Sequence, residues 1–187
     1  TQNQRRNFYF FGNNDNNKDK ISLIEYATFF GSIQIFNYLY KNNVKLTPSL
    51  WIYAIHSDHP ELFSILEENN VEHDKETSFE NLLYESIICH HNDMANYILN
   101  NYIKDEQKIK DDIIFYVLKY YNFGFLQYDL DDDSLFYLVR YEYYFFVKLL
   151  LEEKNIDVNQ IYVIDNIEET LLCYAIEKNI KEIIELL

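Results

Sequence analysis

The stretch ETLLCYAIEKNIKEIIELL, residues 169–187, repeats the apolar pattern of SLIEYATFFGSIQIFNYL, residues 22–39. When the two are aligned, Thr170 falls on Ser22, Ala175 on Ala27 and Ile183 on Ile35. Stretches 148 residues apart therefore share one design, and we expect further copies between them.

Further copies appear when a small or β-branched residue is taken as the anchor of each one. The anchors are Ala27, Ala54, Ser86, Val117, Val139 and Ala175. The residues four before, three before and eight after each anchor are all apolar. These spacings predict a short helix, a break about four residues after the anchor, and a second helix. Because neither helix can bury its apolar stripe alone, the units must stack on one another.

A residue that can cap a helix stands five positions before every anchor. These residues are Ser22, Ser49, Asn81, Asp112, Ser134 and Thr170. The side-chain oxygen of such a residue accepts a hydrogen bond from a free N–H of the first helical turn. We therefore predict that each first helix begins at this position.

Three stretches carry a resemblance to the ankyrin-repeat family. Residues 169–175, ETLLCYA, resemble its Thr-Pro-Leu-His-x-Ala opening, and residues 149–159, LLLEEKNIDVN, resemble the end of an ankyrin unit. Residues 27–33, ATFFGSI, are similar to the family's stretch between helices. The resemblance covers residues 22–187 and implies an all-α, right-handed, ankyrin-like solenoid of about six helix-turn-helix units. It also implies protein binding through the concave groove formed by first helices and loops.

The repeat departs from the family period, which is near 33 residues. The anchors here are spaced by 27, 32, 31, 22 and 36 residues. The fourth unit has no room for two full helices, and Asp129 interrupts its apolar pattern. We therefore expect four irregular units, and we divide the chain into an N-terminal segment, partly loop (1–20), degenerate helical pairs (21–133) and more regular repeats (134–187). Another α-solenoid, of the HEAT or TPR kind, is the less favoured architecture.

Composition favours a helical protein that binds neither nucleic acid nor membranes. Glycine (3) and proline (2) are scarce among 187 residues, 48% of which are apolar. A formal charge of −15 repels phosphate and anionic lipid, and favours a partner with a basic patch. No apolar run reaches the ~20 residues that a membrane span needs. We expect a monomeric, cytoplasmic protein with two reduced thiols, Cys89 and Cys173.

Searches for chemistry give no candidate for catalysis, cofactor or metal. His56 and His59 form one group of possible ligands, and residues 89–93 form another. His59 and His91 hold the same repeat position, and stacked helices lie roughly 8–10 Å apart, too far for a shared zinc ion. The acidic run 129–133 lacks the glycine and glutamate of a calcium loop. We therefore expect a non-enzymatic protein.

Aromatic residues are the strongest unusual feature, with 18 tyrosines and 14 phenylalanines. The positions two and three after each anchor face the groove, by the resemblance. Candidate partner-binding residues are Phe29, Phe30, His56, Tyr120, Tyr141 and Glu142. Two interpretations stay open: large side chains there either fill an irregular groove or anchor a partner.

The function of the chain has two alternatives to partner binding. Terminal units shield the apolar face of a repeat array, so this chain could be a structural cap. It could also be a regulatory segment of a larger ankyrin-repeat protein. The start at Thr1, and the uncapped amphipathic pattern at Glu185–Leu187, lead us to expect that it is a fragment.

Overall fold

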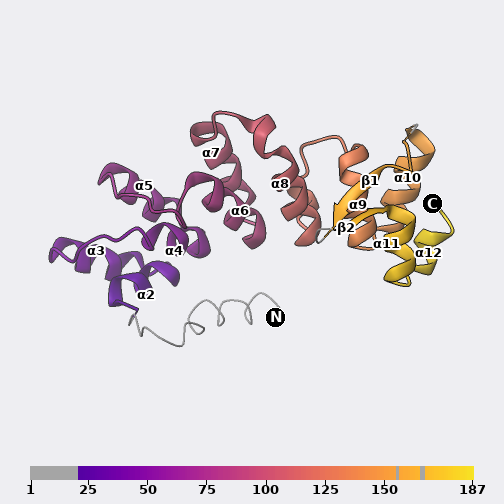
Figure 1. Ribbon diagram of the computed structural model, residues 1–187. Helices are drawn as coiled ribbons and strands as arrows, with labels where there is room; N and C mark the ends of the chain where they lie inside the picture. The colour runs from indigo at the N-terminus through magenta and orange to yellow at the C-terminus, as the bar shows by residue number, and fades with distance from the viewer. Residues whose placement is uncertain (1–20, 155, 165–166) are drawn as a thin grey trace. The chain divides into compact units, whose positions relative to one another are not determined.

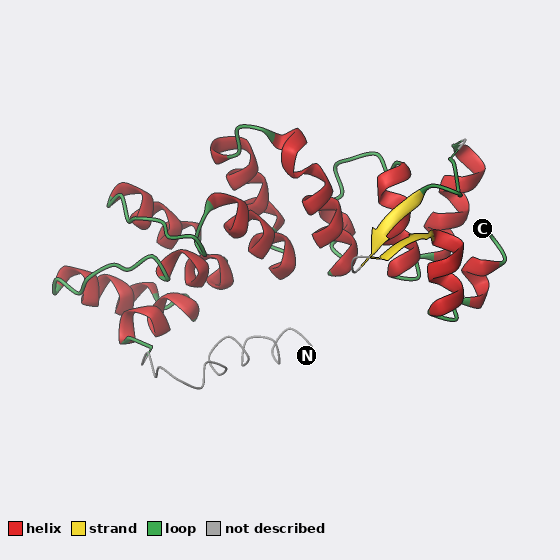
Figure 2. Ribbon diagram, in the orientation of Figure 1, coloured by secondary structure: helices red, strands yellow, loops and turns green. Residues whose placement is uncertain are grey.

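A computed structural model describes residues 21–154, 156–164 and 167–187, and most of these are helical (Figure 2). The predicted N-terminal segment, 1–20, lies outside the described residues. The chain divides into two compact units, one ending at Lys104 and one beginning at Asp105. None of the helices formed by the described residues is both long enough and apolar enough to cross a bilayer.

Over residues 21–104, the first unit contains three pairs of helices. Its helices are α2 (Leu23–Phe29), α3 (Ile33–Lys41), α4 (Leu50–Ser57), α5 (Pro60–Glu68), α6 (Phe79–Cys89) and α7 (Asn92–Tyr102). Within each pair the two helices pack together, and α4 packs between α2 and α6 (Figure 1). The first helices of the three pairs are therefore direct neighbours.

In the part of the second unit that the structure describes, three more helices hold the first position of a repeat, and two strands form a short sheet. Its elements are α8 (Glu106–Lys119), the 3-10 helix η1 (Phe123–Phe125), α9 (Asp132–Arg140), α10 (Tyr144–Glu153), β1 (Ile161–Ile164), β2 (Ile167–Thr170), α11 (Leu171–Glu177) and α12 (Lys181–Ile184). Helix α9 packs between α8 and α11. The η1 turn confirms that the fourth unit has no room for a full second helix, and Asp129 beyond it is exposed.

The two strands form an antiparallel hairpin, in which Ile161 pairs with Thr170 and Ile164 with Ile167. The repeat pattern did not predict this hairpin. In the sequence it lies between α10 and α11, where the 36-residue spacing from Val139 to Ala175 leaves room for it; Figure 2 shows its strands in yellow. The hairpin leads directly into α11, whose first residue follows Thr170.

The predicted apolar positions form the core of both units. All six anchors are buried, each with at most 2% of its surface exposed. Among the other apolar positions the exceptions include Leu23, Ile35 and Leu172, which are exposed. In α3 the neighbouring Phe36 is buried in place of Ile35. Each fully buried apolar side chain contributes about 1.5–3 kcal/mol, so these positions dominate the stability of the fold.

A residue with a positive φ, in the left-handed region, follows each first helix within two positions. These residues are Gly31, Asp58, His90, Tyr121, Glu142 and Asn179. In five of the six turns the next residue donates its N–H to a carbonyl five residues back, as in a Schellman motif. That carbonyl belongs to the predicted anchor at Ala27, Ser86, Val117 and Ala175. In the fifth unit it belongs to Leu138, one residue before the predicted anchor Val139.

The predicted helix starts are confirmed at some repeats and wrong at others. Ser22 and Thr170 accept backbone hydrogen bonds as caps, and α4 begins after Ser49. The starts at Asn81, Asp112 and Ser134 are wrong. Better-placed caps lie upstream, and no glycine or proline intervenes to stop the helix. These caps are Ser78, Asp105 and Asp131.

Gly31 should tolerate alanine poorly. Its φ is +62°, and a Cβ atom there would lie 2.1 Å from the His59 ring. A left-handed non-glycine residue costs about 1–2 kcal/mol, so we expect Gly31→Ala to lower the free energy of unfolding by about 1 kcal/mol. Chemical denaturation measures this change. Gly124→Ala is the control, since Gly124 does not have a positive φ, and an equal loss there would contradict the explanation.

Asp131 should stabilise the start of α9. Burial alone would raise its pKa, but hydrogen bonds from Lys110 and Ser134 hold that pKa below its ordinary value. The folded state therefore favours the ionised form, and this contribution is lost as the pH falls through the folded pKa. We expect Asp131→Ala to lower the free energy of unfolding by about 1 kcal/mol at neutral pH. Asp133→Ala, which removes an exposed charge two residues on, should change it by less than half as much.

Candidate functional site

Three of the predicted partner-binding residues come together in the first unit. The Phe29 ring lies 5.0 Å from that of Phe30 and 5.5 Å from that of His56. Phe29 itself is 9% exposed, whereas Phe30 is 58% exposed. Helices α2 and α4 thus bring these residues together as side-by-side packing requires, but only Phe30 presents most of its surface to solvent.

Helix α2 carries an exposed apolar face around Phe30. Leu23, Tyr26 and Phe30 are 63%, 53% and 58% exposed, and their spacing places them on one side of the helix. The Tyr26 and Phe30 rings are 4.6 Å apart. We call these three residues the α2 surface. Tyr26 and Leu23 were not among the predicted site residues, because the pattern search considered only positions after the anchor.

The other three predicted residues lie in the second unit. Tyr120 and Tyr141 are half-buried, and Glu142 is exposed at a left-handed turn. Tyr120 stacks on Tyr116, and burial raises the pKa of Tyr141. Tyr141 also lies 6.4 Å from Phe115, ring centre to ring centre. This mutual packing is what groove-filling aromatic residues would show.

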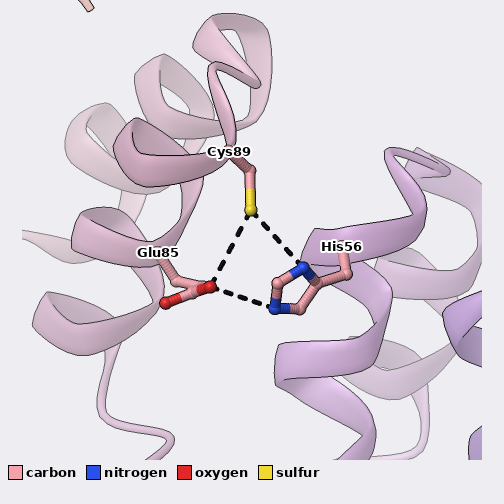
Figure 3. A group of neighbouring side chains, drawn as sticks. All are labelled: His56, Glu85 and Cys89. Carbon is pink, nitrogen blue, oxygen red and sulfur yellow. Dashed lines mark hydrogen bonds and ion pairs between the residues drawn. The ribbon is translucent and has the colours of Figure 1, made fainter. Parts of the chain in front are cut away.

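A second cluster joins α4 to α6 and was not predicted. His56 Nε2 lies 3.0 Å from Glu85 Oε1, and His56 Nδ1 lies 3.5 Å from Cys89 Sγ (Figure 3). Cys89 Sγ is also 3.8 Å from Glu85 Oε1. Glu85 and Cys89 are four residues apart on one helix, so both point to the same side of α6. We call these three residues the α4–α6 cluster.

The α4–α6 cluster is shielded from solvent and negative in character. The His56 and Glu85 side chains are 8% and 19% exposed, and Phe29 covers one side of the imidazole. Burial, followed by the nearby charge of Glu85, raises the pKa of the Cys89 thiol far above its ordinary value. The thiol therefore stays protonated at neutral pH.

A thiol, an imidazole and a carboxylate together occur in two kinds of site, a cysteine nucleophile and a metal site. A cysteine nucleophile would need a thiolate and donors for an oxyanion. Cys89 is instead the last residue of α6, and the negative end of the helix dipole there disfavours both a thiolate and an oxyanion. The N–H groups of His90 and His91 already bond to carbonyls of α6. The cluster is therefore unsuited to nucleophilic catalysis, whereas all three groups are good metal ligands.

In the sequence, His56 and Cys89 fell in separate groups of possible ligands, and the histidines expected to lie at equivalent positions were His59 and His91. His91 Nδ1 lies 2.8 Å from the carbonyl oxygen of Ile55, and the ring of His59 packs by Gly31. The repeat was the sequence signal that could have placed His56 and Cys89 together. His56 is two residues after its anchor, and Cys89 is three residues after the next anchor. Neighbouring first helices bring such positions together.

Comparisons with protein-family models, with curated proteins and with solved structures give no match for this chain.

Cys89 should react slowly with thiol reagents, because the thiolate is the reactive form and the local field disfavours it. Cys173 is exposed, so we expect one fast and one slow thiol when the native chain is titrated with a chromogenic disulfide at neutral pH. Cys173→Ser should remove the fast phase, and Cys89→Ser should remove the slow one. Glu85→Gln should accelerate the slow phase. The reverse assignment of the phases would contradict the field that we describe at Cys89.

Proposed function

We propose that this chain is a non-enzymatic protein-binding module, in which the helix pairs form an ankyrin-like solenoid. The α2 surface is the observation that supports binding best. An apolar helix face of three large side chains, each more than half exposed, is unfavourable in water unless a partner covers it. Aromatic side chains in such a patch are frequent anchors of protein interfaces.

The charge of the chain suggests the nature of the partner. A formal charge of −15 creates a negative field that attracts a protein with a basic patch and accelerates its association. An apolar anchor with complementary charges around it would combine affinity from the aromatic contact with specificity from the field. Phe29 packs against Phe30, and His56 packs against Phe29. These two residues would therefore hold the Phe30 anchor in position.

The half-buried aromatic residues of the second unit fit a different role within the same proposal. Tyr120 and Tyr141 contact other rings, and Lys119 lies 5.0 Å above the ring of Phe115. These contacts hold the first helices of the second unit against one another. A purely structural cap would also show such packing, so the exposed α2 surface is what favours binding over capping.

Affinity capture with the whole chain as bait tests the proposal. We expect Tyr26→Ala with Phe30→Ala to reduce recovery of a specific partner at least tenfold, as loss of an aromatic anchor does. Recovery should also fall as salt is raised. Phe145→Ala is the matched control, since Phe145 is 69% exposed in the second unit. Circular dichroism confirms that each variant is folded.

The outcomes separate the two roles. A partner that is lost with the α2 variants and kept with Phe145→Ala supports the proposal. The proposal is contradicted if the amount of partner recovered changes neither with the α2 substitutions nor with the salt concentration. Recovery of no specific partner also contradicts it, and favours the capping role.

A further inference from the structure

We propose that His56, Glu85 and Cys89 form a binding site for a divalent cation, with Zn²⁺ as the metal that the ligand set favours. Among the described residues these three are the group of histidine, cysteine and acidic side chains whose ligand atoms approach within 4.8 Å of one another. The inference concerns the α4–α6 cluster and does not rest on the α2 surface.

The ligand set selects the metal. Thiolate and imidazole ligands suit zinc and other borderline or soft ions, whereas calcium and magnesium prefer sites made of oxygen. A thiolate, an imidazole and a carboxylate are each common zinc ligands, and three protein ligands leave one position open for water or another ligand. The cluster therefore has the composition of a zinc site with three protein ligands.

The geometry needs little adjustment. Tetrahedral zinc with ordinary bond lengths places its ligand atoms roughly 3.3–3.6 Å apart. The Cys89 Sγ to His56 Nδ1 distance is 3.5 Å, and the Sγ to Glu85 Oε1 distance is 3.8 Å. Rotation of the Glu85 carboxylate, the end of a flexible side chain, would move its oxygen from Nε2 toward the metal. The three side chains face one another between the two helices (Figure 3), and one ligand atom from each lies within 4.8 Å of the other two.

The surrounding field favours a cation. His56 lies in the last turn of α4 and Cys89 is the last residue of α6, so two negative helix ends meet at the cluster. Glu85 adds a charge, and the charge of Asp58 also acts on Cys89. The same field that makes Cys89 a poor nucleophile stabilises a positive ion. The Phe29 ring against His56 limits access of water on one side, which strengthens these interactions.

Binding has a defined stoichiometry and structural effect. The metal displaces one proton from the Cys89 thiol, and that proton leaves to solvent. The bonds then join α4 to α6 directly. Because the unfolded chain does not hold the three ligands together, binding also stabilises the folded state.

Titration of the metal-free whole chain with Co²⁺ tests the site. Co²⁺ replaces zinc and gives a near-ultraviolet band when a thiolate binds it. We expect this band at one ion per chain, and we expect it to disappear in Cys89→Ser. His56→Gln and Glu85→Gln should weaken binding by more than about 100-fold, because removal of a ligand exceeds the cost of outer-shell changes. Zn²⁺ should bleach the band and raise the thermal midpoint of the wild-type chain by about 5 °C or more.

Cys173→Ser and His59→Gln are the controls, since each removes a similar group outside the cluster. Both should keep the band and the affinity of the wild-type chain. Circular dichroism shows whether each variant is folded. If Cys89→Ser is unfolded, His56→Gln takes its place as the test variant. The proposal fails if the wild-type chain gives no thiolate band. It also fails if the band survives Cys89→Ser, is lost with Cys173→Ser, or is unchanged in His56→Gln and Glu85→Gln.

Discussion

Close packing of the first helices is the constraint on which the rest of this structure depends. These helices are short, between 7 and 14 residues, and helices of that length are marginal alone. Each gains its stability by burying a small or apolar anchor against the neighbouring helices. The left-handed turn that follows the anchor reverses the chain and satisfies the free carbonyls of the helix end. All six turns contain a left-handed residue even though its identity differs, from glycine to tyrosine, and five of the six also have the Schellman hydrogen bond.

The same packing explains why residues distant in sequence meet. Because α2, α4 and α6 lie side by side, a residue after the anchor of one helix reaches its counterpart on the next. Phe29 thus meets His56, and His56 meets Cys89 and Glu85. The helix ends meet at the same place, so the field there is negative. A regular scaffold has in this way brought together three metal-binding side chains and an environment that suits a cation.

The aromatic residues divide into two groups by exposure. Those on α8 and α9 pack against one another and stiffen the second unit. On α2, Tyr26 and Phe30 remain in contact with each other but open to solvent. Exposure therefore separates the aromatic residues of the α2 surface from the half-buried ones of α8 and α9.

The sequence alone determined the helical class, the six buried anchors, the shortened fourth unit and the turns after five of the six first helices. These depend on local periodicity, which the chain carries within a few residues. It did not determine where α6, α8 and α9 begin. Each of these helices starts at a capping residue further upstream, because no glycine or proline lies between that cap and the predicted start. Nor did the sequence show the hairpin at 161–170 or the meeting of His56, Glu85 and Cys89. Those features depend on which side of one helix faces the next, and only the tertiary packing fixes that rotation.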